Sequence, residues 1–416
     1  MIVFGIFLVL IFILSLVSHR LKKTILSAPM IFTSAGIIVF LVIPELALVE
    51  VNNKTVLLLA ELALAFTLFG DASCIQARSV LRDSQLPDRL LLIGMPLTIF
   101  AGLIIGLLVF TSLTFWEAAI LAVILTPTDA SLGAAIATSP RVPDRIRQAL
   151  NIESGLNDGL SVPFLMLFIA LARVDSPLEN TSWILYTLQV IGLGLLVGGV
   201  MGWGSGWLMG IAARRGWTEE KAEQLGLLAV VVLTFFIAQQ IGGNEFIAAF
   251  VAGLLVKVGF VDAGERLVDF NEAWGELLVY FVFFIFGAIA APILPTITFS
   301  VVVYAALSLT LVRMLPVAVS MLGVGLQRSS VLIMGWFGPR GLTSIVLGFV
   351  YLKEEANLPG EPLILLTVAA TVLLSVFAHG ISTVPAINRY GAQVESLPPE
   401  APEFSEPAAV SSVDSP

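Results

Sequence analysis

Long apolar runs, separated by short polar segments, fill the chain from its first residue to about residue 387. A helix needs about 20 mostly apolar residues to cross a bilayer. The pattern predicts about thirteen membrane spans, at residues 1–17, 29–48, 55–75, 90–112, 116–138, 147–172, 183–212, 222–241, 245–260, 271–291, 297–325, 329–352 and 362–387. We therefore expect an all-α, polytopic membrane protein.

The basic residues give these spans a direction. Cytoplasmic loops of membrane proteins carry an excess of Lys and Arg. With the amino terminus outside, 16 of the 21 Lys and Arg residues fall in cytoplasmic segments. They are Arg20, Lys22, Lys23, Arg78, Arg82, Arg89, Arg141, Arg145, Arg147, Arg214, Arg215, Lys221, Lys257, Arg266, Arg328 and Arg389. Because omitting one span would reverse every later loop, the asymmetry favours an odd number of spans and a cytoplasmic carboxyl terminus.

Composition agrees with this class and excludes others. Apolar residues make up 58% of the chain and charged residues 12%, whereas soluble domains have about 45–50% and about 25%. A net charge of −9 without a basic cluster argues against a nucleic-acid partner. No His or Cys cluster has the spacing of metal ligands, so we expect no cofactor. His19 and His379 lie far from the acidic residues in sequence, and no nucleophile–base pair indicates an enzyme.

Charged residues inside the predicted spans are the candidate functional groups, because each costs about 2.5–3.5 kcal/mol to insert. The strong candidates lie near the middle of their spans and are Asp129, Glu153, Asp158, Arg313 and Arg340. Weaker candidates lie nearer span ends and are Glu61, Asp71, Glu245 and Glu276.

Two spans contain a proline next to such a charge. Pro127 lies in T-P-T-D (126–129) and Pro339 lies in G-P-R-G (338–341), each about ten residues into its span. Proline removes a helical hydrogen bond and clashes with the preceding turn, so both helices should break. The two spans run in opposite directions. Interrupted helices at corresponding places in two oppositely oriented halves predict an inverted-repeat transporter with a midplane site.

The sixth span carries E-S-G-L-N-D at residues 153–158. At 100° per residue, Ser154 and Asp158 lie one turn apart on one face. We expect this face to meet the oxygens around Thr128. Glu153 and Asn157 form a second stack about 100° away. Because an unpaired buried Glu is costly, Glu153 should meet one of the two buried arginines, Arg313 or Arg340.

These motifs resemble the monovalent cation:proton antiporters, in particular the NhaP-like branch of the sodium/proton exchangers. T-P-T-D, E-S-G-L-N-D, the buried Arg313 and G-P-R-G carry the resemblance, which covers residues 1–390. Two departures are the position of Pro127, two residues before Asp129, and the acidic residue that some relatives carry in the third span. Asp71 is the nearest residue to that position.

The resemblance implies roles for these residues. Asp158 would bind either a proton or a cation such as Na⁺, with Asn157 as its partner and Thr128 and Ser154 as further cation oxygens. Asp129 would belong to the cation-binding residues and would offset the positive ends of the half-helices at the crossing. Glu153 with Arg340 or Arg313 would form a structural ion network, and Asp71 is a possible accessory group.

The resemblance also implies an architecture of two broken crossing helices in a core that moves against a scaffold. The core would comprise residues 90–172 and 297–387, and the scaffold, which forms a homodimer, residues 1–75 and 183–291. Residues 391–416, rich in Pro, Ser, Ala and Glu, are expected to be a disordered cytoplasmic tail.

The expected function is electroneutral exchange of Na⁺ or Li⁺ for H⁺ across the bacterial inner (plasma) membrane, by alternating access. Hard monovalent cations suit carboxylate and hydroxyl oxygens. A K⁺/H⁺ exchanger is the alternative within this class. An ion channel or sensor of the same fold is a further alternative, although the sequence contains no selectivity-filter motif.

Overall fold

The computed structural model describes residues 2–21, 24–43, 54–74, 85–173, 177–260, 263–398 and 400–404. Within these ranges the chain forms helices and no β-strand. Besides the short 3-10 helices η3 (Ala291–Thr296) and η4 (Pro402–Phe404), the described helices are α1 (Ile2–Leu21), α2 (Ala28–Val42), α3 (Lys54–Cys74), α5 (Gln85–Arg89), η2 (Leu90–Gly94), α6 (Met95–Val109), α7 (Phe115–Ile124), α8 (Ala130–Ala137), α9 (Asp144–Ala172), α10 (Pro177–Arg214), α11 (Glu220–Gln240), α12 (Glu245–Gly259), α13 (Ala263–Ala290), α14 (Phe299–Leu309), α15 (Leu311–Ser320), α16 (Arg328–Trp336), α17 (Leu342–Lys353) and α18 (Glu361–Val394).

The predicted all-helical membrane class is confirmed. In the described part of the chain, nine helical segments are long and apolar enough to cross a membrane, and α2, α7 and α17 are shorter apolar helices. Each predicted span overlaps one of these helices or two consecutive ones. The total of thirteen spans stays a prediction. Of the basic residues assigned to cytoplasmic segments, Lys22, Lys23, Arg78 and Arg82 lie outside the described residues.

Both predicted helix breaks are present. α7 ends at Ile124 and α8 begins at Ala130, with Pro127 in the non-helical segment between them. α16 ends at Trp336 and α17 begins at Leu342, with Pro339 between them. Each proline lacks the N–H that would continue its helix.

Two further irregularities were not predicted. The span expected at 297–325 consists of α14 and α15, which are separated at Thr310 with φ −108° and ψ −89°. The span expected at 90–112 begins with the π-helix η2, in which the N–H of Met95 donates to the carbonyl of Leu90. Pro96, at the start of α6, has no N–H to donate, which accounts for a disturbed hydrogen-bond ladder at this point.

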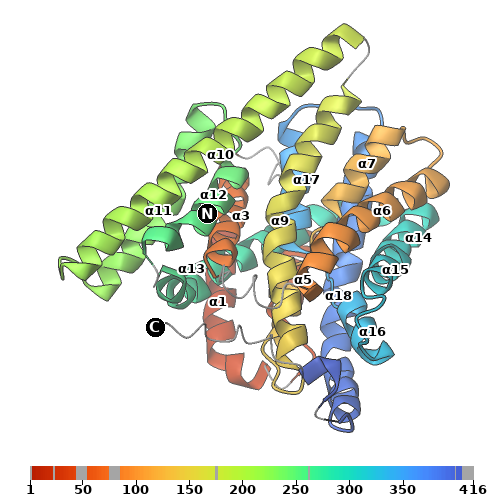
Figure 1. Ribbon diagram of the computed structural model, residues 1–416. Coiled ribbons are helices and arrows are strands. Elements are labelled where there is room, and N and C mark those ends of the chain that lie inside the picture. Colours follow the sequence, from red (N-terminus) through yellow and green to blue (C-terminus); the bar gives the residue numbers. More distant parts are fainter. Residues whose placement is uncertain are drawn as a thin grey trace.

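The helices form two groups on either side of α9 (Figure 1). α10 packs on α12, and α13 packs on α2 and α3; α6 packs on α7, and α14 packs on α18. The α10–α12 contact is close at three glycines of α10. A Cβ on Gly198, Gly202 or Gly206 would overlap the α12 backbone. Small residues permit such close packing in membranes. α9 contacts helices of both groups, including α3, α7 and α10.

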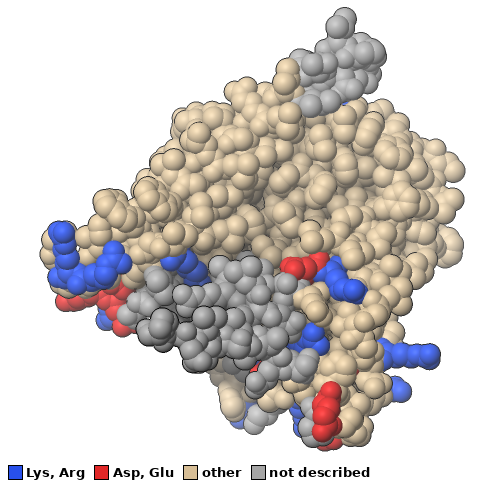
Figure 2. All heavy atoms as spheres, viewed as in Figure 1, with Lys and Arg blue, Asp and Glu red and all other residues tan. Residues whose placement is uncertain are grey.

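Charged side chains are absent from much of the face seen in Figure 2. Figure 2 shows a wide band without Lys, Arg, Asp or Glu, with charged side chains gathered toward one end of the visible face. Large apolar side chains such as Phe12, Leu196 and Trp203 are exposed. An uncharged band of this kind suits the hydrocarbon core of a bilayer, which is about 30 Å thick.

The carboxyl-terminal boundary differs from the prediction. α18 continues to Val394, beyond residue 390, and η4 (Pro402–Phe404) packs against the protein. The buried carboxylate of Glu403 accepts hydrogen bonds from the Gln327 N–H at 2.7 Å and the Ser330 hydroxyl at 2.8 Å. The prediction began the disordered tail at 391, whereas residues 391–394 belong to α18 and residues 402–404 form η4. Residues 405–416 lie outside the described part.

Candidate functional site

Asp129 lies between the two broken helices and contacts both. Its N–H donates to the Pro339 carbonyl at 2.8 Å. Its carboxylate accepts from the N–H of Leu342 at 2.6 Å and from the N–H of Ser131 at 2.7 Å. Leu342 begins α17 and Ser131 lies in the first turn of α8. Because the first N–H groups of a helix have no internal acceptor and carry a partial positive charge, Asp129 caps both half-helices with one negative charge.

Arg340 has the complementary position at the opposite end of a half-helix. Its guanidinium donates to the carbonyl of Thr126 at 2.5 Å and to that of Pro127 at 3.0 Å, and the side chain is fully buried. These carbonyls follow the end of α7, where helix acceptors have no partner and the dipole is negative. The crossing therefore has a carboxylate at two amino ends and a guanidinium at one carboxyl end.

Two glycines allow this close approach. A Cβ on Gly341 would overlap the Asp129 carboxylate, and a Cβ on Gly338 would overlap the Arg313 guanidinium. Any side chain at either position would displace a charged group from its partners. This explains why glycine stands on both sides of Pro339 and Arg340 in G-P-R-G.

Asp158 lies in the middle of α9 and is only 3% exposed. Its Oδ2 accepts a hydrogen bond from the Thr343 hydroxyl at 2.6 Å. Its Oδ1 is buried and has no hydrogen-bond partner among the described residues. Asp158 therefore has one oxygen held by α17 and a second that is open to another ligand.

Thr128, Ser154 and Asn157 form a separate cluster. The Thr128 hydroxyl lies 3.0 Å from the Ser154 hydroxyl and accepts from the Asn157 amide at 2.9 Å. The Thr128 N–H also donates to Asn157 Oδ1 at 3.3 Å. Ser154 meets Thr128 as expected, and Asn157 of the second stack also reaches Thr128, while Glu153 turns to another neighbour. Residues three apart are also neighbours on a helix, so Ser154 and Asn157 reach Thr128 together.

Asp71 lies beside the same part of α9. A Cβ on Gly155 would lie 3.0 Å from the Asp71 Cβ, so Asp71 packs closely against α9 at this glycine. Asp71 Oδ2 is buried without a hydrogen-bond partner among the described residues. Its charge interacts with those of Asp158 and Asp129. Asp71, three residues before the end of α3, therefore lies beside the part of α9 that carries Asp158.

Glu153 pairs with Arg313 and not with Arg340. Two guanidinium nitrogens of Arg313 donate to the two carboxylate oxygens of Glu153 at 2.5 and 2.7 Å, and both side chains are 2% exposed. This bidentate geometry is the strongest form of the interaction. It joins α9 to α15, while Arg340 binds backbone carbonyls.

Sequence reasoning did not identify Thr343, Ser131 or Ser375, although each binds a residue of the site. Ser375 accepts from the Arg340 N–H at 2.7 Å. Thr343 and Ser131 each follow a helix break by one or two residues. A hydroxyl in the first turn after a break was the available signal.

A second group of charges lies at the carboxyl end of α17. Lys353 donates to Glu61 of α3 at 2.7 Å and to Glu245 of α12 at 3.1 Å. Glu61 and Glu245 are thus paired with a lysine far from Asp158 in sequence. These contacts connect α17 to helices of the other group.

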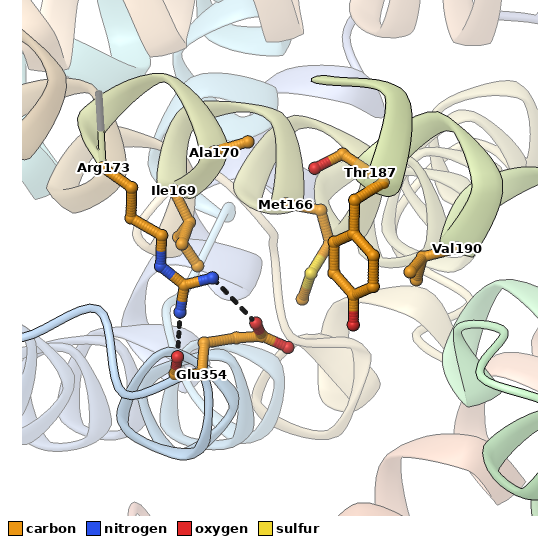
Figure 3. Close-up of a pocket in the computed structure, with 8 residues that line it drawn as sticks. Met166, Ile169, Ala170, Arg173, Thr187, Val190 and Glu354 are labelled. Carbon is orange, nitrogen blue, oxygen red and sulfur yellow. Dashed lines mark hydrogen bonds and ion pairs between the residues drawn. The ribbon is translucent and has the colours of Figure 1, made fainter. Parts of the chain in front are cut away.

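A cavity of about 30 Å³ lies near this end, between α9 and α10 (Figure 3). Arg173 points toward Glu354 and binds both its backbone carbonyl and its carboxylate, the latter at 3.6 Å. Burial raises the pKa of the Glu354 carboxyl, and Arg173 opposes that rise. None of the predicted site residues lines this cavity, so it is not the site at Asp158.

Crossed, broken helices with charged caps and a buried carboxylate define the class of inverted-repeat membrane transporters. Comparison with known proteins gives the family. The family described as sodium/hydrogen exchanger, transmembrane, matches residues 6–389, and the chain belongs to it.

Relatives in this family have names that differ in the cation. The chain is 24% identical to the K⁺/H⁺ antiporter NhaP of Alkalimonas amylolytica over 64% of its own length and 46% of that protein. It is 26% identical to the Na⁺/H⁺ antiporter ApNhaP of Aphanothece halophytica, over 83% of its own length and 67% of that protein. The match covers 62% of the Na⁺/H⁺ antiporter NhaG of Bacillus atrophaeus. The chain thus spans about half of the length of the Alkalimonas NhaP and less than two thirds of the length of NhaG.

The fold is similar to that of a solved antiporter. The structure of the sodium proton antiporter MjNhaP1 from Methanocaldococcus jannaschii aligns with a TM-score of 0.75 at 18% identity, covering 95% of this chain and 99% of that one. At 18% identity this similarity shows the fold alone.

Proposed function

We propose that this protein is a secondary active transporter that exchanges Na⁺ or Li⁺ for H⁺, and that Asp158 binds either ion. The single observation that supports this most strongly is the arrangement of the Asp158 carboxylate. One oxygen is bound to Thr343 and the other is buried without a protein partner among the described residues. A proton or a small cation can satisfy that oxygen, and the two compete for it.

The neighbouring oxygens supply further ligands of the kind that hard cations prefer. Thr128, in the break between α7 and α8, and Ser154, one helical turn before Asp158 on α9, lie within hydrogen-bonding distance of each other. Asn157 holds Thr128 through two hydrogen bonds and so supports the geometry without carrying charge. Asp129 is engaged as a helix cap, and in this proposal it contributes its field and not a transported proton.

Alternating access would move the core, residues 90–172 and 297–387, against the scaffold, residues 1–75 and 183–291. The contacts of Lys353 with Glu61 and Glu245 join the two groups at one end of the molecule. With the amino terminus outside, this is the outer end. Opening the site to the outside would require these ion pairs to separate, and they favour the closed outer side.

The remaining assignments belong to the same proposal. The protein acts as a transporter and not as an enzyme, in the bacterial inner membrane with a cytoplasmic carboxyl terminus. It forms a homodimer through its scaffold and needs no cofactor. K⁺/H⁺ exchange is the second candidate, favoured by the name of the Alkalimonas relative.

The test is ion exchange in proteoliposomes with an internal pH dye. Imposed gradients of Na⁺, Li⁺ and K⁺ should each be compared at equal concentration, and Na⁺ and Li⁺ should drive proton movement most strongly. Asp158→Asn should abolish exchange while the protein still folds, because the amide neither protonates nor neutralises a cation. Exchange by purified Asp158→Asn at the parental rate would contradict the assignment, and a response to K⁺ alone would favour the second candidate.

A further inference from the structure

We infer that Thr343 is a positioning residue for ion exchange, which orients the Asp158 carboxylate so that its Oδ1 faces the transported cation. The inference rests on the proposed exchange at Asp158 and adds a residue that lies outside the predicted site. Thr343 is 2% exposed, and its hydroxyl donates to Asp158 Oδ2 at 2.6 Å. Hydrogen bonds to an ionised oxygen of this length are among the strong ones.

The Thr343 contact decides which way the carboxylate faces. The terminal torsion of an Asp side chain is broad and has little preference of its own. Among the described residues, Thr343 is the hydrogen-bond donor that Asp158 has. With Oδ2 held, the plane of the carboxylate is fixed and Oδ1 points to the remaining side.

Thr343 itself is held by the helix crossing. It lies in the first turn of α17, next to Leu342, whose N–H donates to the Asp129 carboxylate at 2.6 Å. Consecutive residues of α17 therefore bind Asp129 and Asp158, the first through the backbone and the second through a side chain. A shift in either break would change the orientation of Asp158 through this turn.

The residue type fits a positioning role. Threonine is β-branched, which leaves its χ1 fewer rotamers than an unbranched side chain has. Its hydroxyl donates one hydrogen bond. Asp158 Oδ2 can accept this bond both when Oδ1 carries a proton and when Oδ1 binds a cation. Without the hydroxyl, the carboxylate can rotate and the cation meets a less ordered ligand. The cation affinity should fall, while the rate at saturating cation, set by conformational exchange, should change little.

The experiment measures the cation concentration dependence of exchange in proteoliposomes at one fixed pH. Thr343→Val removes the hydroxyl at nearly constant volume and should raise the apparent KM for Na⁺ at least about tenfold, as expected for a lost hydrogen bond to a charged group, with the maximal rate within about threefold. Thr343→Ser should restore the KM to within about threefold of the parent, because it retains the donor. Ser344→Ala is the matched control, since the adjacent Ser344 is equally buried and its hydroxyl has no partner among the described residues.

A second readout is independent of transport. Na⁺ should raise the melting temperature of the purified parent in detergent, and the Na⁺ concentration at the midpoint of that rise should increase in Thr343→Val but not in Ser344→Ala. If Thr343→Val does not fold, Thr343→Ala should show the same rise in KM. If folded Thr343→Val has the KM of the parent, or if Ser344→Ala changes the KM equally, the inference is overturned. The proposed function still stands in that case, provided that the parent protein exchanges Na⁺ for H⁺. A parent that exchanges no cation overturns both.

Discussion

The buried charges of this site differ in how completely each is paired. Glu153 and Arg313 satisfy each other through two hydrogen bonds in a fully desolvated position. A buried pair of this kind adds little net stability over apolar residues, but the removal of one partner leaves the other charge uncompensated. The contribution of this pair to stability should therefore appear when only one of the two residues is replaced.

We predict that Glu153→Ala and Arg313→Ala each destabilise the protein by about 3–5 kcal/mol, and by more than Asp158→Asn does. The double replacement Glu153→Met with Arg313→Met should be less harmful than either single change. Arg147→Ala is the matched control, because Arg147 pairs with the exposed Asp144 and surface pairs contribute about 0–1 kcal/mol. Thermal unfolding in detergent gives the comparison. Equal melting temperatures for Arg313→Ala and Arg147→Ala would show that the buried pair has no structural role.

The sequence located the chemistry of the site more readily than the pairing. The spacing in E-S-G-L-N-D places Ser154 and Asp158 on one helical face, but the angle about one helix axis does not say which neighbour packs there. The choice between Arg313 and Arg340 depends on how α15 is oriented, and the bond from Thr343 to Asp158 depends on where α17 begins. Both are properties of the packed structure.

At the scale of elements, each broken helix needs partners for the backbone groups that its break releases. α16 ends at Trp336, whose carbonyl lies 2.9 Å from His379 Nε2. Because a carbonyl only accepts, Nε2 is the donor in this contact, and Nδ1 lies 3.1 Å from the Ser375 hydroxyl and 3.0 Å from the Ser375 carbonyl. Ser375 in turn accepts from the Arg340 N–H. α18 therefore satisfies both sides of the second break.

We expect His379→Leu to lower the melting temperature, since a buried carbonyl without a partner costs about 1–3 kcal/mol. His379→Gln retains a donor and should recover part of the loss. Ser382→Ala serves as the control, because it removes a hydrogen bond to the Trp336 indole on the same helix without affecting the break. A melting temperature of His379→Leu equal to that of Ser382→Ala would refute this role.

Most elements follow from the sequence because apolar length and proline positions determine them directly. The interruption between α14 and α15 at Thr310 and the ordered residues 395–398 and 400–404 do not. The first has no proline at the interruption itself. The second depends on Glu403 meeting Gln327 and Ser330, which are more than 70 residues away in the sequence.

At the scale of the whole molecule, the charge moved in one transport cycle depends on how many carboxylates of the site titrate. In the proposed mechanism Asp158 carries one proton in one direction and one monovalent cation in the other. Asp129 is engaged as a cap by backbone N–H groups of two half-helices. Asp71 is a further carboxylate beside the site, and its Oδ2 is buried. We predict that the exchange is electroneutral, with Asp158 as the only carrier.

A net movement of one charge would couple to voltage by about 2.3 kcal/mol per 100 mV, whereas one-for-one exchange has no such coupling. The measurement uses proteoliposomes with a Na⁺ gradient, a potential clamped by valinomycin and K⁺, and Li⁺ as a second substrate to control for K⁺ transport. The rate and the final pH difference should be the same at every potential. A systematic dependence on potential would mean that a second group titrates. Asp71→Asn would then identify it, because removing Asp71 should restore voltage independence if Asp71 is the second carrier and leave the dependence intact if it is not.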